Sequence, residues 1–170
     1  MILGMSLSTF TMVHVIISLI AIVAGLIVMS GMLGSKTGPG ATAIFLLFTI
    51  LTSATGFLIP PLVTEKLLPS HIIGGLSLVL LAIACVALYG AKLSGMWRWI
   101  YVVTALVSLY LNVFVLVVQG FLKVGPLHAL APSVPPSGPP FAILQGILLV
   151  FFVIVMIGAV RRFRPVSAYA

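Results

Sequence analysis

The chain has 170 residues, of which 62% are hydrophobic and only 5% are charged. This composition excludes an ordinary soluble globular domain, in which about a quarter of the residues are charged. The net charge of +7 does not predict a nucleic-acid partner, because the basic residues are scattered over short loops and a tail instead of forming one stripe.

Apolar segments follow one another along the chain, and about 20 such residues suffice to cross the hydrocarbon core of a bilayer. We therefore predict an all-α integral membrane protein, with residues 1–170 forming a single membrane domain around a bundle of five transmembrane helices. The predicted spans cover residues 10–33, 41–60, 69–90, 97–121 and 141–160.

Four connections join these spans. Only one of them is long, residues 122–140, with the sequence "LKVGPLHALAPSVPPSGPP". This segment holds six of the 11 prolines in the chain. Because proline disfavours a continuous helix, we expect an extended, polyproline-like loop over the outer face of the bundle and no sixth span.

The basic residues predict which way the bundle is oriented, because cytoplasmic loops retain Lys and Arg. If the N-terminus lies outside, two basic residues face outward, Lys66 and Lys123. Six face inward: Lys36, Lys92, Arg98, Arg161, Arg162 and Arg164. We therefore predict an external N-terminus and a cytoplasmic C-terminus, with the basic side against anionic lipid. Trp97, Trp99 and Tyr101 would form an aromatic anchor at the inner interface.

Polar side chains gather toward the predicted outer end of every span. His14 and Ser18 lie early in the first span, His71 begins the third, and Gln145 lies within the first turns of the fifth. Amides and imidazoles are costly in lipid, so they should turn toward the interior of the bundle. The sequence therefore predicts a polar pocket that opens on the outer face.

Imidazole is a ligand for zinc, copper and haem iron, so the histidines suggest a metal site. His14 and His71 come from different helices at similar depth, and His128 and Glu65 lie in outer loops that could close the site from above. Copper or zinc is the favoured metal and haem b is less favoured, because no ligand pair has the spacing of bis-histidine haem bundles. In the alternative interpretation, His14 and His71 hydrogen-bond to neighbouring helices, and His128 is a solvated loop residue.

Four further side chains are candidate ligand-binding residues: Ser18, Asn112, Gln119 and Gln145. Asn112 and Gln119 are seven residues apart and share a helix face. They would line a pocket for a quinone-like or other small ligand. The alternative is that these groups only hydrogen-bond between helices.

Several activities are disfavoured. The chain has a single acidic residue, which excludes a relay of buried carboxylates. The segment "GSKTGPG" has a Lys-Thr pair but lacks the spacing of a phosphate-binding P-loop. We do not expect an independent enzyme.

Four segments together resemble small inner-membrane proteins of proteobacteria, a group without an established activity. They are "HVIISLIAIVAGLIVMSG", "TSATGF", "LLPSHIIGG" and "WRWIYVVTALVSLYLNVFVLVVQGFLKVGPLHALAP". The likeness covers about His14 to Pro165 and implies a multi-pass protein of the bacterial inner membrane.

Two functions are expected from these observations. The first is a periplasm-facing pocket that binds a transition metal, a quinone-like molecule or another small ligand in a redox or metal-handling role. The second is a non-catalytic accessory subunit that packs, through small-residue helix faces and the proline-rich loop, against a larger respiratory or transport complex. The expected partners are the lipid bilayer and either another membrane protein or further copies of this chain. We do not expect a nucleic-acid partner.

Overall fold

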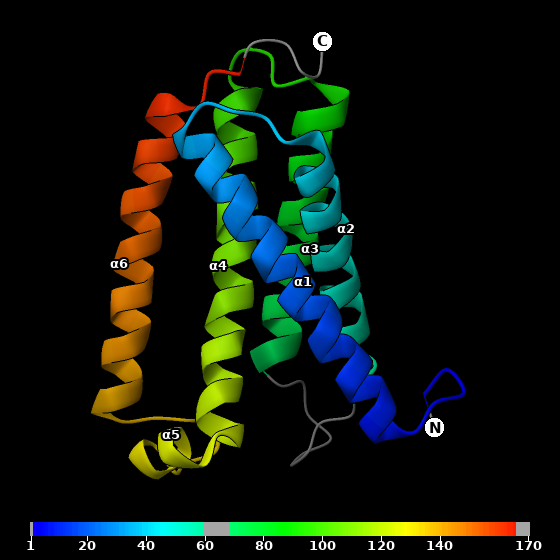
Figure 1. Ribbon diagram of the computed structural model, residues 1–170, viewed down its shortest axis with the longest axis vertical. Coiled ribbons are helices and arrows are strands. Elements are labelled where there is room, and N and C mark those ends of the chain that lie inside the picture. Colours follow the sequence, from blue (N-terminus) through cyan, green and yellow to red (C-terminus); the bar gives the residue numbers. More distant parts are fainter. Residues whose placement is uncertain (1, 60–68, 166–170) are drawn as a thin grey trace.

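The computed structural model describes residues 2–59 and 69–165, which fold into a bundle of long helices (Figure 1). The helices are α1 (Leu7–Leu33), α2 (Pro39–Gly56), α3 (Pro69–Cys85), α4 (Trp97–Lys123), α5 (Gly125–Leu130) and α6 (Pro139–Arg162). A π-helical turn, η1 (Val86–Gly90), continues α3. Among these described residues, five helices are long and apolar enough to cross a membrane, as predicted.

The helices begin where the local sequence supplies a start signal. Ser6 caps α1, because its hydroxyl accepts a hydrogen bond from the Thr9 N–H at 3.1 Å. Proline opens both α2 and α6, where its missing N–H and fixed φ suit the first turn. Each start lies within about four residues of the predicted one, because hydropathy places the middle of a span better than its ends.

The proline-rich connection differs from the prediction in one respect. Residues 125–130 form the short helix α5 instead of extended chain, because Pro126 stands in its first turn, where proline favours helix. The following prolines lie where no helix forms, up to the start of α6. The prediction that this connection contains no sixth span is confirmed.

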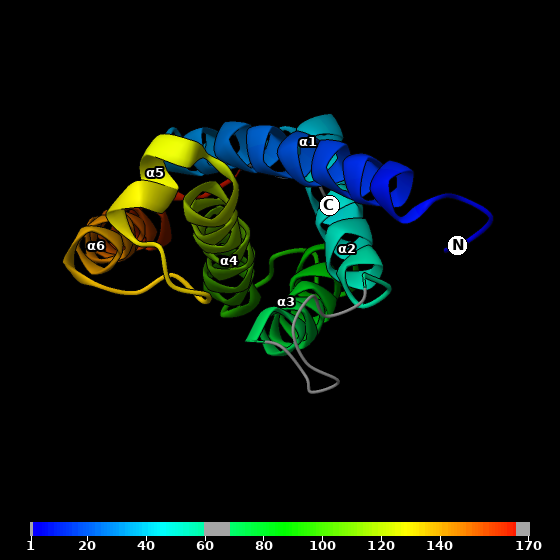
Figure 2. The same ribbon diagram turned by 90° about the horizontal axis from the view of Figure 1, so that it is seen from below.

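Helix α4 is the centre of the bundle (Figure 2). It packs against α3, α6, α1 and α2, whereas α1 packs mainly along α2 and α6 packs mainly on α4 and α1. The core consequently forms around Val102, Ala105 and Leu109 of α4, which are fully or almost fully buried with Phe45 of α2 and Leu81 of α3. Helix α6 is the most peripheral span, and its apolar face is consistent with contact with lipid.

Close packing between α1 and its neighbours depends on Gly25. A Cβ atom added at this position would lie 2.5 Å from Leu109 Cδ1 and 2.9 Å from Phe45 Cδ2. Gly25 therefore allows α1 to approach α2 and α4 more closely than any larger residue would permit.

The two ends of the bundle carry different chemistry. The loop between α1 and α2, the loop before α4 and the end of α6 all lie at one end (Figure 1). We call this the basic end; its residues are Lys36, Lys92, Arg98, Arg161, Arg162 and Arg164. The other end carries His14, His71 and His128 and is called the histidine end. The start of α1 and the end of α6 therefore lie at opposite ends of the bundle.

The predicted aromatic anchor is only partly correct. Trp99 is 42% exposed, as an interfacial residue would be, but Tyr101 is 2% exposed and packs against Phe163 with ring centroids 6.2 Å apart. Tyr101 lies one turn after Trp97, on the face of α4 that points into the core. Its surroundings therefore follow from the helix face on which it lies and not from its depth in the membrane. The prediction that this tyrosine faces the membrane interface is wrong.

Candidate functional site

His14 and His71 both lie beside the end of α2. His14 Cε1 would be 3.6 Å from a Cβ built at Gly56, and the His71 ring stacks on Phe57 with centroids 5.6 Å apart and planes 24° apart. The end of α2 is therefore a neighbour of both imidazoles, one from α1 and one from α3. Both rings are half-buried.

The hydrogen bonds of Thr55 assign the tautomer of His14. The Thr55 hydroxyl oxygen lies 2.6 Å from the Leu51 carbonyl oxygen, which can only accept, so the hydroxyl donates its proton there. His14 Nδ1 lies 2.7 Å from the same hydroxyl and must supply the other proton. In the neutral imidazole, Nε2 then carries a lone pair and is a hydrogen-bond acceptor or a metal ligand.

His128 lies in a different part of the histidine end. Its Nδ1–H donates to the Phe121 carbonyl oxygen at 3.1 Å, which fixes α5 against the end of α4. Within residues 2–59 and 69–165, no group of three or more His, Cys, Asp or Glu side chains is arranged to hold a metal ion. The three histidines therefore share one end of the bundle but do not form one cluster. Glu65, the fourth predicted ligand, lies outside the described residues.

The four predicted ligand-binding side chains are also dispersed. Ser18 donates to the His14 carbonyl oxygen of its own helix at 2.7 Å. Asn112 Nδ2 lies 3.5 Å from the Thr49 hydroxyl of α2, and Gln145 Nε2 donates to the Phe114 carbonyl oxygen of α4 at 3.2 Å. Gln119 is half-buried near the end of α4. Two of the four thus bridge helices.

Three buried polar atoms have no hydrogen-bond partner among the described residues: Thr52 Oγ1, Ser77 Oγ and Gln145 Oε1. Such groups are rare in folded proteins and mark places where water or a ligand supplies the missing partner. Thr52 lies one turn before Thr55 on α2, so one of the three is close in sequence to the hydroxyl that orients His14.

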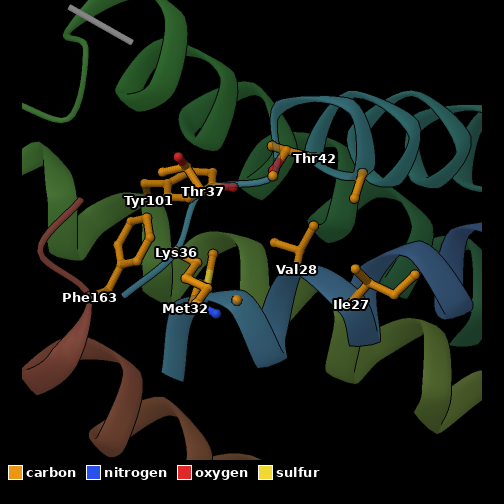
Figure 3. Close-up of a pocket in the computed structure, with 11 residues that line it drawn as sticks. Ile27, Val28, Met32, Lys36, Thr37, Thr42, Tyr101 and Phe163 are labelled. Carbon is orange, nitrogen blue, oxygen red and sulfur yellow. The ribbon is translucent and has the colours of Figure 1, made fainter. Parts of the chain in front are cut away.

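Sequence analysis missed a second polar site at the basic end. A cavity of about 210 Å³ lies between the end of α1, the start of α2, Tyr101 and Phe163 (Figure 3). Its polar lining residues are Lys36, Thr37, Thr42 and Tyr101. The sequence signal is the Lys-Thr pair of "GSKTGPG" immediately before a proline-initiated helix, a pair that lacks the P-loop spacing.

The chain matches no known family model, no curated protein and no solved structure. The resemblance to inner-membrane proteins of proteobacteria therefore stays a prediction. The fold itself, an all-helical bundle with five apolar helices of membrane-spanning length in the described part of the chain, fits a multi-pass membrane protein.

Proposed function

We propose that this membrane protein binds a small lipophilic ligand with a hydroxyl donor, of the quinol type, at the histidine end, and that His14 is the side chain that contacts it. We further propose that this end faces the periplasm or the equivalent outer compartment. The orientation rests on the basic residues, because six of the eight Lys and Arg residues in the sequence lie at the opposite end of the bundle.

The observation that carries the proposal is the hydrogen bond between His14 and Thr55 at 2.7 Å. Thr55 occupies Nδ1 and so leaves Nε2 as an acceptor on a ring that is only half-buried. An acceptor of this kind suits a phenolic O–H, because the ligand supplies the proton that the imidazole nitrogen lacks. A polar atom at membrane depth is otherwise expensive, which favours a functional role.

Neighbouring groups support a ligand at this end. Thr52 contributes a buried hydroxyl without a protein partner in the described structure, and the Phe57–His71 stack offers an aromatic surface at the same end of α2. An aromatic ligand ring would find both a polar and an apolar contact there.

A quinol-type ligand fits the described residues better than copper or zinc does. A stable metal site requires three or four ligands at fixed distances, and the described histidines do not form such a group. A ligand held by one hydrogen bond and apolar contacts needs only the arrangement around His14.

Binding of a fluorescent or absorbing short-chain quinol to the purified protein tests the proposal. His14→Ala should weaken binding about tenfold, which is the effect of losing one buried hydrogen bond to an imidazole. His128→Ala is the matched control, because its Nδ1 bonds to a backbone carbonyl at 3.1 Å on α4, away from the end of α2. Equal affinity of the protein and of His14→Ala would contradict the proposal. Metal analysis of the same samples tests the copper or zinc alternative.

A second candidate function is a structural subunit of a larger membrane complex. The outward face of α6 has a shallow apolar depression lined by Gly146, Ile147, Val150, Phe151 and Ile154. Ile147 and Ile154 are 62% and 65% exposed, and a Cβ at Gly146 would have no neighbour within 4 Å. This favours a second helix packing on α6, because a glycine on an apolar face lets another helix approach closely.

Purification from native membranes in a mild detergent separates the two functions. Ile147→Trp should remove a co-purifying partner of fixed stoichiometry if α6 is a subunit interface, whereas Leu149→Trp, at an exposed position on another face of α6, should not. If the partner still co-purifies with both variants, this face of α6 is not the interface.

A further inference from the structure

The cavity at the basic end is a crevice between two helices. Ile27, Val28 and Gly31 of α1 form one wall, and Ala41 and Thr42 of α2 form the other. Tyr101 and Phe163 close it, and Figure 3 shows these rings beside the Lys36 segment. Its volume is about 210 Å³.

The mouth of the crevice carries positive charge. Lys36 is exposed in the loop between α1 and α2, and its backbone N–H donates to the Gly31 carbonyl oxygen at 2.8 Å, which fixes the loop against α1. Arg164 lies beside the same loop, because its backbone N–H donates to the Ser35 hydroxyl at 2.9 Å. The single acidic residue of the sequence, Glu65, lies outside the described residues.

The start of α2 adds unused hydrogen-bond donors. Its N-cap, Gly38, has no side chain to cap the helix, and Pro39 has no N–H. The bond from the Thr42 N–H to the Gly38 carbonyl oxygen, at 2.8 Å, is the first of the helix. The N–H groups of Gly40 and Ala41 precede it, and the helix dipole makes this turn favourable for an anion.

Thr42 adds a polar side chain inside the crevice. Its side chain lines the crevice and the residue is only 3% exposed. The hydroxyl of Thr42 makes no hydrogen bond within the described structure, whereas the Thr49 hydroxyl, two turns further along α2, donates to the Phe45 carbonyl oxygen at 2.7 Å. Thr42 Oγ1 is not one of the fully buried atoms without a partner, so it is open to the crevice, where a polar ligand group would be its hydrogen-bond partner.

The rest of the crevice is apolar and opens toward the side of the bundle. Ile27 is 57% exposed and lies away from Lys36, further along α1 toward the membrane centre (Figure 3). A ligand that satisfies both parts must combine an anionic head with an apolar tail.

We propose that this crevice binds the phosphate group of an anionic phospholipid, with Lys36, the first turn of α2 and Thr42 around the phosphate and an acyl chain along Ile27. The site is separate from the histidine end and does not depend on the function proposed there.

Native mass spectrometry of delipidated protein, titrated with phosphatidylglycerol or with phosphatidylcholine of the same chains, tests the proposal. Lys36→Gln should weaken binding of phosphatidylglycerol about fivefold. Lys92→Gln removes an equally exposed charge from the same end but outside the crevice, and should leave binding unchanged.

Two further variants test the crevice without altering its charge. Thr42→Val keeps the shape and removes the hydroxyl, and should weaken binding about threefold. Its control is Thr104→Val, because the buried Thr104 hydroxyl already donates to the Ile100 carbonyl oxygen at 2.8 Å. Ala41→Leu fills the crevice and should remove the specific binding. If this variant unfolds, the Thr42→Val result still decides the test.

Three results would overturn the proposal. They are equal weakening by Lys36→Gln and Lys92→Gln, equal affinity for the two lipids, and displacement of the lipid by excess inorganic phosphate. The first would show a diffuse charge effect, the second a neutral lipid site, and the third a site for a free anion.

Discussion

Arg98 at the start of α4 donates from Nη1 to the Phe163 carbonyl oxygen just beyond the end of α6, and the Val160 carbonyl oxygen lies 3.5 Å from the same nitrogen. A guanidinium at a helix C-terminus satisfies carbonyl groups that the helix leaves without partners. This contact therefore fixes the central helix to the most peripheral one at the basic end.

Replacing Arg98 by Met should destabilise the protein by about 1.5–3 kcal/mol, because a charge-assisted hydrogen bond to buried carbonyls is lost. Unfolding in mixed micelles of increasing denaturing detergent measures this. Arg161→Met is the control, since Arg161 is exposed in the last turn of α6. If both variants unfold at the same detergent concentration as the parent protein, the Arg98 contact does not hold α6 in place.

Enlarging Gly25 should be far more harmful than enlarging Gly146. Gly25→Ala places a Cβ 2.5 Å from Leu109 Cδ1 and 2.9 Å from Phe45 Cδ2, so these buried side chains or α1 itself must shift, at a cost of about 1–3 kcal/mol. Gly146→Ala meets no atom within 4 Å and should be neutral or stabilising, because alanine favours helix more than glycine does. Thermal unfolding in detergent compares the two. Similar melting temperatures would mean that α1 does not pack as described.

Thr55→Val should weaken both the bundle and the ligand site. The variant loses the 2.7 Å bond to His14, which costs about 1 kcal/mol in a membrane helix pair. It also frees the His14 ring to change tautomer, so ligand binding should fall even though Thr55 itself need not touch the ligand. Thr11→Val is the matched control, because the Thr11 hydroxyl bonds only within its own helix, to the Leu7 carbonyl oxygen at 2.8 Å. Unchanged ligand affinity in Thr55→Val would contradict the assigned role.

Gln145 distinguishes a hydrogen bond that only joins helices from one that also serves a ligand. The buried Oε1 atom lacks a partner in the described structure, while Nε2 donates to the Phe114 carbonyl oxygen at 3.2 Å. Gln145→Leu should therefore leave stability within about 1 kcal/mol of the parent, since the loss of one bond is offset by removal of an unpaired polar atom. A fall in ligand affinity without a fall in stability would place Gln145 in the binding site. A large loss of stability would show that removing the unpaired Oε1 atom does not offset the lost hydrogen bond.

Accessibility of single cysteines tests the orientation. In a Cys85→Ser background, Ser133→Cys in the connection at the histidine end should react with a membrane-impermeant maleimide on intact cells. Ser94→Cys, exposed in the loop at the basic end, should react only after the membrane is opened. The reverse pattern would mean that the basic end faces outward.

The helical architecture could be predicted because it depends on local composition. Apolar runs of about 20 residues define spans whatever their neighbours do, and the five such helices in the described part of the chain follow from counting these runs. The unequal distribution of Lys and Arg was also visible in the sequence, and the loops bring those residues to one end because each span reverses the direction of the chain.

The site could be predicted only in part, because it depends on which helix faces meet. Depth along a helix placed the histidines at one end, but it did not show that His14 and His71 both lie beside the end of α2 or that His128 lies against α4. The crevice at Lys36 requires Phe163, more than 120 residues away in sequence, to lie beside Tyr101. No short-range pattern contains that contact.

The π-helical turn η1 (Val86–Gly90) lies where the third span reaches the basic end. A π turn accommodates one residue more than an α turn over nearly the same distance. Losing one residue here would let the span close as ordinary α-helix without displacing Lys92 or the start of α4. This turn is therefore the point at which evolution or an engineer could shorten the chain by one residue and leave both ends of the bundle in register.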